Sequence, residues 1–139
     1  MRNAECGKHS TSITIHIARR LTMERKHKQL HVWHDAMALV EIIYQVTSQL
    51  PDSEKFGLVS QMRRAAVSVA SNIAEGSARS SEKDFLRFLY ISRGSLAELE
   101  TQLEIAARLN FLNKDICCEP IERLFAKLAS LINKIKVAH

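Results

Sequence analysis

The sequence is poor in the residues that interrupt secondary structure. Its 139 residues include only four glycines and two prolines, although 46% are hydrophobic and 25% are charged. This composition excludes a protein built from many short strands and turns, and it favours a few long elements in one globular domain. We therefore expect an all-α fold.

The sequence contains few cysteines, and most of the chain contains no histidine. Three cysteines, two of them the adjacent Cys117 and Cys118, do not make a disulfide framework, and no apolar run is long enough for a transmembrane segment, so we expect a reducing cytoplasm. No histidine lies between Asp35 and Ala138. A serine or cysteine nucleophile would lack its usual base there, and no glycine-rich phosphate loop precedes a helix, so we expect neither an enzyme nor a cofactor.

Three histidines near the start of the chain are the one pattern that suggests a metal. His27, His31 and His34 would share a face of a continuous helix and could then bind a transition metal. The alternative is a charged, frayed N-terminal turn, and we expect this alternative and no metal site.

The formal charge of +5 is concentrated at the N-terminus. Residues 1–22 carry four basic residues and one acid, whereas the rest of the chain carries 16 basic and 14 acidic residues. The charge of the body is therefore weak evidence for a polyanionic partner. We expect residues 1–29 to form a loosely ordered basic extension and residues 30–139 to form the folded domain, and we hypothesise that translation begins at Met23.

Hydrophobic spacing predicts four helices joined by short loops, an antiparallel up-down-up-down four-helix bundle. The first three span about 32–49, 55–75 and 82–109. We expect Gly76 in a left-handed conformation after the second helix and Ser81 capping the third. Pro120 suits the first turn of the last helix, which would leave residues 114–118 as a separate turn or a kinked lead-in.

The apolar faces are broad. The seam of the third helix is polar only at Ser92, and further apolar residues flank the seams of the second and third helices. Either these residues widen a single core, or they drive self-association. They are Val59, Ala66, Ala70, Leu86, Phe88, Ile91 and Ile105.

Several sequence blocks together resemble a known family. The blocks are Leu30-His31-Val32-Trp33, Phe56-Gly57-Leu58, Gln61-Met62-Arg63-Arg64-Ala65-Ala66-Val67-Ser68, Asn72-Ile73-Ala74-Glu75-Gly76, Phe88-Leu89, Arg93-Gly94-Ser95-Leu96 and Glu98-Leu99-Glu100. Over roughly residues 30–136 the chain resembles the four-helix-bundle proteins encoded in bacterial 23S rRNA intervening sequences, and it is similar in architecture to accessory proteins of diversity-generating retroelements. The resemblance implies a homopentamer and an association with RNA or a reverse transcriptase, with no assigned activity.

Two groups of basic residues are candidate nucleic-acid contacts. If the turn between the second and third helices centres near Ala78, Arg64 lies level with Arg93 and Ser68 with Leu89, so two arginines could hold one phosphate. Alternatively, the arginines pair with acids such as Glu75 and Glu98. The full set of candidates is Arg63, Arg64 and Arg93, with Arg79, Lys83 and Arg87 as a second group that is otherwise a solvated face.

We therefore expect a non-enzymatic oligomer that serves as a nucleic-acid-associated scaffold, with RNA or a reverse transcriptase as partner. The alternative is a protein-interaction or structural homo-oligomer without a nucleic-acid role, in which the arginines hold the subunits together. Neither reading involves a membrane or a small-molecule substrate.

Overall fold

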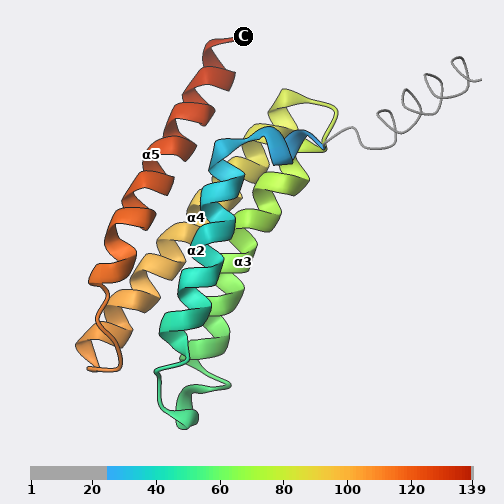
Figure 1. Ribbon diagram of the computed structural model, residues 1–139. Helices are drawn as coiled ribbons and strands as arrows, with labels where there is room; N and C mark the ends of the chain where they lie inside the picture. Colours follow the sequence, from blue (N-terminus) through green and yellow to red (C-terminus); the bar gives the residue numbers. More distant parts are fainter. Residues whose placement is uncertain (1–24, 139) are drawn as a thin grey trace, which may run out of the picture.

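The computed structural model describes residues 25–138, and this part of the chain contains four long α-helices and no strand (Figure 1). The long helices are α2 (His31–Thr47), α3 (Leu58–Ser77), α4 (Glu82–Arg108) and α5 (Asp115–Val137). Two short 3-10 helices, η1 (Lys26–Gln29) and η2 (Asp52–Glu54), precede α2 and α3. The all-α prediction is confirmed, and each predicted helix is present with shifted ends.

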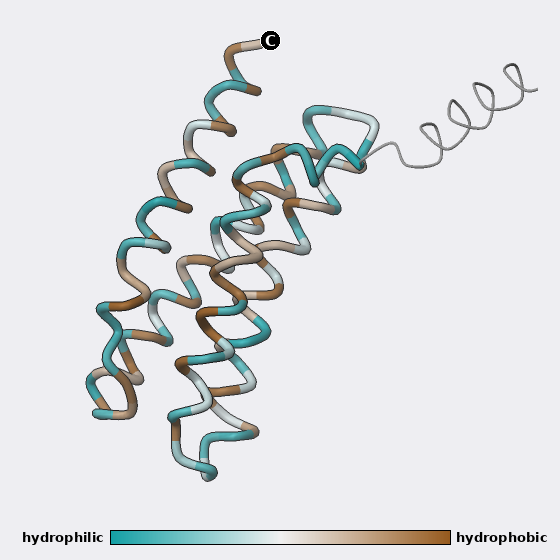
Figure 2. The backbone as a smooth tube through the Cα atoms, in the orientation of Figure 1, coloured by the Kyte–Doolittle hydropathy of each residue, from teal (hydrophilic) through white to brown (hydrophobic). Residues whose placement is uncertain are grey.

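Each helix contacts its neighbours in the chain, and α5 also contacts α2. Within the described residues, the backbones of α2 and α4, and those of α3 and α5, are not in contact. The order of the helices around the core is therefore α2, α3, α4, α5. Hydrophobic and hydrophilic residues alternate along every helix (Figure 2). One continuous core results, and its largest fully buried side chains are Leu39, Ile43, Met62, Val69, Ile73, Leu89, Leu96, Leu99, Leu124 and Leu128.

The contacts between α3 and α4 run in opposite order along the two helices. Ser68 Oγ lies 2.9 Å from Ser95 Oγ, and Ser92 Oγ donates to the Val69 carbonyl at 2.8 Å. Nearer the turn, Gly76 faces Phe88. The single polar residue of the α4 seam, Ser92, is thus buried without an unsatisfied hydroxyl.

The position of Gly76 differs from our prediction. Gly76 lies inside α3, which continues to Ser77, and no described glycine has a positive φ. A Cβ atom built on Gly76 would lie 2.6 Å from Phe88 Cβ and 3.0 Å from Phe85 Cδ2. Glycine is needed here because α4 approaches the backbone of α3 closely, and not because Gly76 adopts a left-handed conformation.

The end of α4 supplies the left-handed residue instead. Asn110 has φ 60°, the Phe111 N–H donates to the Ala106 carbonyl at 2.9 Å, and the Asn110 N–H donates to the Ala107 carbonyl at 3.0 Å. These two bonds form a Schellman motif, with asparagine in the position that glycine usually takes. At the other end of α4, Ser81 Oγ accepts from the Asp84 N–H at 3.2 Å, which confirms the predicted cap.

Helix α5 begins earlier than predicted. It starts at Asp115 and runs through Pro120, so residues 114–118 are not a separate turn. Asn113 Oδ1 accepts from the Asp115 N–H at 3.0 Å and starts the helix. Because Pro120 lies in the second turn, its missing N–H removes only the bond to the Ile116 carbonyl, and the remaining turns bury one apolar face.

The extra apolar residues fall into three groups, of which the half-buried Leu86 and Phe88 form one. Val59, Ala66 and Ala70 are buried, so this row of α3 belongs to the core, as the wider-core alternative predicts. Ile91 and Ile105 of α4, by contrast, are 42% and 43% exposed. The described domain therefore leaves apolar surface open on α4.

The described residues include the end of the expected N-terminal extension. Lys26–Gln29 forms η1, which contacts α2 and α3. Residues 1–24 of the extension, including the hypothetical start at Met23, lie outside the described residues. The Trp33 ring makes edge contacts with the His27 and His34 rings, each at 5.0 Å between centroids. His27 and His31 lie on different helices, so the continuous helix that a shared histidine face requires does not form.

Candidate nucleic-acid interface

The six basic residues selected from the sequence do not form one surface. They lie along α3, the following turn and α4. Three are held by contacts inside the domain, and three have no partner in the described range 25–138. Of the three that are held, Arg63 and Arg79 are structural cations, whereas within the described chain Arg93 contacts only an exposed aromatic ring.

Arg63 stabilises the end of α2. Its Nε donates to Thr47 Oγ1 at 3.0 Å, its Nη2 donates to the Tyr44 carbonyl at 3.4 Å, and its Cζ lies 4.4 Å from the centroid of the Tyr44 ring. A cation at this position also interacts favourably with the negative end of the α2 dipole. Arg63 therefore contacts a hydroxyl, a carbonyl and a ring, whereas the alternative reading expected a carboxylate.

Arg79 is held at the turn between α3 and α4. Its Nη2 lies 3.0 Å from Glu75 Oε1, and its Cζ lies 4.8 Å from the centroid of the Phe88 ring. This arrangement matches the alternative in which these arginines pair with nearby acids. Half of the Arg79 side chain is exposed, so the ion pair itself contributes little to stability.

The prediction that Arg64 of α3 lies opposite Arg93 of α4 is wrong. Ser95, six residues from the expected Leu89, lies opposite Ser68, and Arg64 shares a surface hollow with Glu98. Arg93 lies closer to the α3–α4 turn than Glu98 does, so Arg64 and Arg93 do not hold one phosphate between them. No described residue makes an ion pair, hydrogen bond or ring contact with the Arg64 side chain.

Lys83 and Arg87 lie one turn apart on the exposed face of α4. Within residues 25–138 neither side chain has an ion-pair or hydrogen-bond partner. Together with Leu86, Tyr90 and Ile91 they line a shallow hollow, in which Asp84 contributes a carboxylate. This hollow presents free cations beside an exposed aromatic ring.

The Tyr90 ring of α4 is contacted by cations from two helices, α4 and α5. Arg93 Cζ lies 4.8 Å from the centroid of the ring, and Lys136 Nζ, from the last turn of α5, lies 5.4 Å from the same centroid. The Tyr90 side chain is 36% exposed. We call Lys83, Arg87, Tyr90, Arg93 and Lys136 the Tyr90 face.

Tyr90 and Lys136 were absent from the sequence-based candidates. The signal that could have revealed Tyr90 is its spacing of three from both Arg87 and Arg93, which places all three on neighbouring positions of a helix. Lys136 belongs to another helix, and only the packing of α5 against α4 brings it to the ring.

A second, more enclosed hollow lies between α4 and α5, beside the turn that joins them. Its volume is about 350 Å³, its floor contains the buried residues Leu103, Cys117 and Ile121, and its rim carries Glu100 and Glu122. Burial raises the pKa of the Cys117 thiol to about 11, so this cysteine is an inert apolar group at neutral pH. We call this hollow the α4–α5 pocket.

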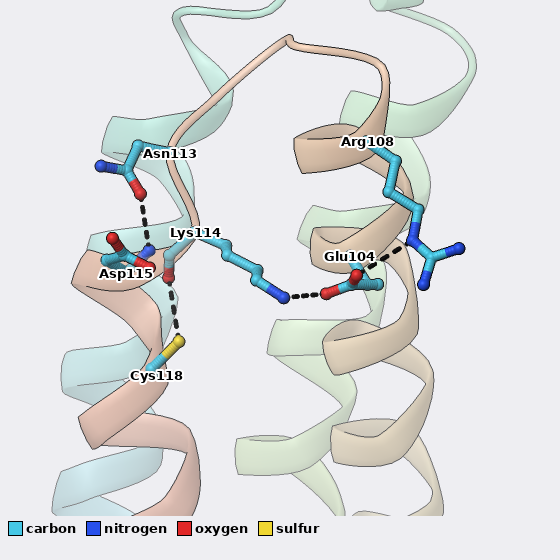
Figure 3. Close-up of polar contacts among 6 residues, drawn as sticks. All are labelled: Glu104, Arg108, Asn113, Lys114, Asp115 and Cys118. Carbon is cyan, nitrogen blue, oxygen red and sulfur yellow. Dashed lines mark hydrogen bonds and ion pairs between the residues drawn. The ribbon is translucent and has the colours of Figure 1, made fainter.

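Glu104 joins the two helices at the pocket wall. It makes ion pairs with Lys114, which reaches across from the start of α5, and with Arg108 one turn along α4 (Figure 3). The hydrogen bond from Lys114 is the main cause that lowers the pKa of Glu104, and the same bond raises the pKa of Lys114. The positive charge of Lys114 is thus paired with Glu104, whereas no described residue makes an ion pair with Glu100 or Glu122.

These features define a class of protein: an all-α, four-helix domain with an exposed basic and aromatic face. None of the described helices is both long enough and apolar enough to cross a membrane. The chain belongs to the family described as 23S rRNA-intervening sequence protein, whose match covers residues 28–134. This assignment confirms the resemblance of the sequence blocks to the proteins encoded in 23S rRNA intervening sequences.

A solved structure has the same fold. It is the crystal structure of a protein of unknown function from the S23 ribosomal protein family of Bacteroides thetaiotaomicron, with a TM-score of 0.55 and 22% identity. The similarity covers 75% of this chain and 94% of that one. No curated protein matches the sequence.

Proposed function

We propose that this protein is a non-enzymatic scaffold, an antiparallel up-down-up-down bundle that assembles as a homopentamer and associates with nucleic acid in the cytoplasm. Its partner is RNA, or a reverse transcriptase together with RNA. The observation that carries the nucleic-acid role is the Tyr90 face, where an exposed aromatic ring lies among four cations. Membership of a family named for an rRNA intervening sequence supports the choice of RNA.

The composition of the Tyr90 face suits a single-stranded polyanion. Cations that lack internal partners, here Lys83 and Arg87, contact phosphates by releasing counterions. The exposed part of the Tyr90 ring, beside Arg93 and Lys136, offers aromatic surface to a base. Asp84 is the only carboxylate among the residues that line the adjacent hollow. Of the six candidates from the sequence, Lys83, Arg87 and Arg93 belong to the Tyr90 face and are the proposed contacts, joined by Tyr90 and Lys136. Arg64 also lacks a partner within the described residues, but it lines a different hollow beside Glu98.

The alternative function is a protein-interaction or structural homo-oligomer without a nucleic-acid role. The exposed side chains Phe56, Ile91 and Ile105 favour it, because they are apolar surface that a partner would cover.

Fluorescence anisotropy of a labelled single-stranded RNA tests the nucleic-acid role at low and at physiological salt. We expect Arg87→Glu to weaken binding at least tenfold at low salt. It should also flatten the plot of log affinity against log salt by about 0.7 or more, because each phosphate contact contributes about 0.7 to the slope for single strands.

Arg123→Glu is the matched control. The substitution makes the same change in charge at a residue that is also exposed, on α5. Arg123 lies 13 residues before Lys136, about 20 Å along the helix at 1.5 Å per residue. Equal losses for the two variants would indicate a general charge effect and contradict the assignment to the Tyr90 face. Wild-type protein that binds no RNA at low salt would overturn the nucleic-acid role itself.

A further inference from the structure

The turn between α2 and α3 carries an unusual apolar residue. Phe56 is 91% exposed, the highest exposure of any large hydrophobic side chain in the described part of the chain. Lys55 precedes it, and the Lys55 Nζ atom lies 5.7 Å from the centroid of the Phe56 ring. The pair therefore forms a projection with an apolar tip and a positive charge, and we call it the Lys55-Phe56 knob.

The α4–α5 pocket has complementary properties. Its floor of Leu103, Cys117 and Ile121 is apolar, and its rim carries Glu100 and Glu122, which have no ion pair within the described domain. Its volume of about 350 Å³ falls at the low end of the roughly 300–1,000 Å³ range of specific ligand sites, a size suited to one aromatic side chain. A phenyl ring on the floor would bring the neighbouring ammonium group to the two carboxylates.

The knob cannot fill the pocket of its own chain. Both features lie at the same end of the bundle, where the α2–α3 and α4–α5 connections are drawn in Figure 1. The knob, however, is on the flank formed by α2 and α3, and the pocket is on the flank formed by α4 and α5. Two complementary patches on opposite flanks, at one level, are the arrangement from which a head-to-tail ring is built.

We propose that the Lys55-Phe56 knob of one subunit inserts into the α4–α5 pocket of the next copy of this chain. Phe56 covers the floor, and Lys55 pairs with Glu100 and Glu122. An aromatic anchor in a pocket with a charged rim is the usual composition of an interface hot spot. The contact deepens the proposed function, because it rests on the oligomer proposed above and names the surfaces that join its subunits.

The experiment measures molar mass by light scattering or sedimentation, at several protein concentrations, for the full chain and for exposed variants that leave the core unchanged. We expect Phe56→Ser, and separately Glu100→Lys with Glu122→Lys, to lower the mass of the oligomer to that of the monomer. Two controls should keep the wild-type mass. Val137→Ser removes an apolar side chain that is 85% exposed at the other end of the bundle, and Glu119→Lys reverses an exposed charge of α5 that does not line the pocket.

Two further measurements identify the pairing and its direction. Lys55→Glu should weaken association, and Lys55→Glu combined with Glu100→Lys and Glu122→Lys in one chain should restore it, since the charges are then exchanged across the contact. Mixing the knob variant Phe56→Ser with the doubly substituted pocket variant should give a pair of chains and nothing larger, because one functional knob and one functional pocket remain between them.

The outcomes separate this contact from the oligomer on which it rests. Wild-type mass in both knob and pocket variants would overturn the contact and leave the oligomer standing. A wild-type protein that is monomeric at every concentration would overturn the oligomer and the contact together. Failure of the charge exchange to restore association would overturn the pairing of Lys55 with the two glutamates.

Discussion

The two glycines inside helices should respond to alanine with opposite signs. Gly76 and Gly94 both lie within long helices, where alanine is favoured over glycine by about 0.5–1 kcal/mol because glycine loses more conformational freedom on folding. Their surroundings differ. A Cβ atom on Gly94 would meet nothing within 4 Å, whereas a Cβ atom on Gly76 would lie 2.6 Å from Phe88 Cβ.

The net effect follows from these distances. Gly94→Ala should raise the free energy of unfolding by about 0.5–1 kcal/mol, the full gain in helix propensity. Gly76→Ala gains the same amount but forces α3 and α4 apart, and overpacking of this kind costs about 1–3 kcal/mol. We therefore expect Gly76→Ala to lower the free energy of unfolding by about 0.5–2 kcal/mol.

Urea unfolding followed by circular dichroism measures both variants. The protein concentration must be the same in every sample, because association contributes to the apparent stability of an oligomer. Stabilisation of the Gly76→Ala variant to the same extent as Gly94→Ala would refute the close approach of α4 to Gly76. A fall in stability for Gly94→Ala, together with a lower molar mass, would instead mean that another subunit packs on Gly94.

Two other predictions concern polar contacts between helices. Arg63→Lys should lower the free energy of unfolding by about 1 kcal/mol, because lysine lacks the fork that reaches both Thr47 and the Tyr44 carbonyl. The control Arg64→Lys should leave the urea midpoint unchanged. Equal effects of the two substitutions would contradict the structural role of Arg63. Glu104 has a lowered pKa in the folded state, so its contribution is present above its unfolded pKa and is lost as the pH falls through the folded pKa. Glu104→Gln should therefore reduce the urea midpoint at neutral pH and have little effect in acid, and an equal reduction at both pH values would disprove the ion-pair account.

Hydrophobic spacing was sufficient to find the four helices, because each long helix buries one continuous apolar stripe. The ends were less predictable. Helix α3 begins at Leu58, three residues after the expected Lys55, since η2 occupies the start of the connection and Glu54 Oε2 accepts from the Leu58 N–H at 3.2 Å. Pro120 was read as a helix start, although one lost hydrogen bond in an early turn does not outweigh a buried face.

The relative level of α3 and α4 could not be found from the sequence. Our counting placed the centre of the turn at Ala78, which assumed that Gly76 ends α3 and that the helices separate evenly on both sides of the turn. The close packing of Gly76 on Phe88 shifts the two helices relative to each other. As a result Arg64 lies near Glu98, and the phosphate site that Arg64 and Arg93 would form disappears.

The candidate site depended on contacts between residues far apart in the chain. Lys136 and Tyr90 are separated by 46 positions, and no local pattern indicates that a lysine of α5 reaches a tyrosine of α4. Likewise, the internal partners of Arg63 and Arg79 include rings that lie 19 and nine residues away. A list of basic residues therefore overestimates the surface that is free to bind.

The Tyr90 face and the proposed subunit contact lie at different ends of the bundle, and this separation has a consequence for binding. From Tyr90 to Leu103 at the pocket floor is 13 residues of α4, about 20 Å at 1.5 Å per residue. A ring closed through the Lys55-Phe56 knob would leave every Tyr90 face uncovered and would repeat it once in each subunit. A face with few phosphate contacts binds weakly alone, but linked copies on one strand gain the effective concentration that turns weak contacts into avidity. The monomeric knob variant, Phe56→Ser, should then retain the weak RNA contact of its single Tyr90 face and lose the tight binding of the assembly.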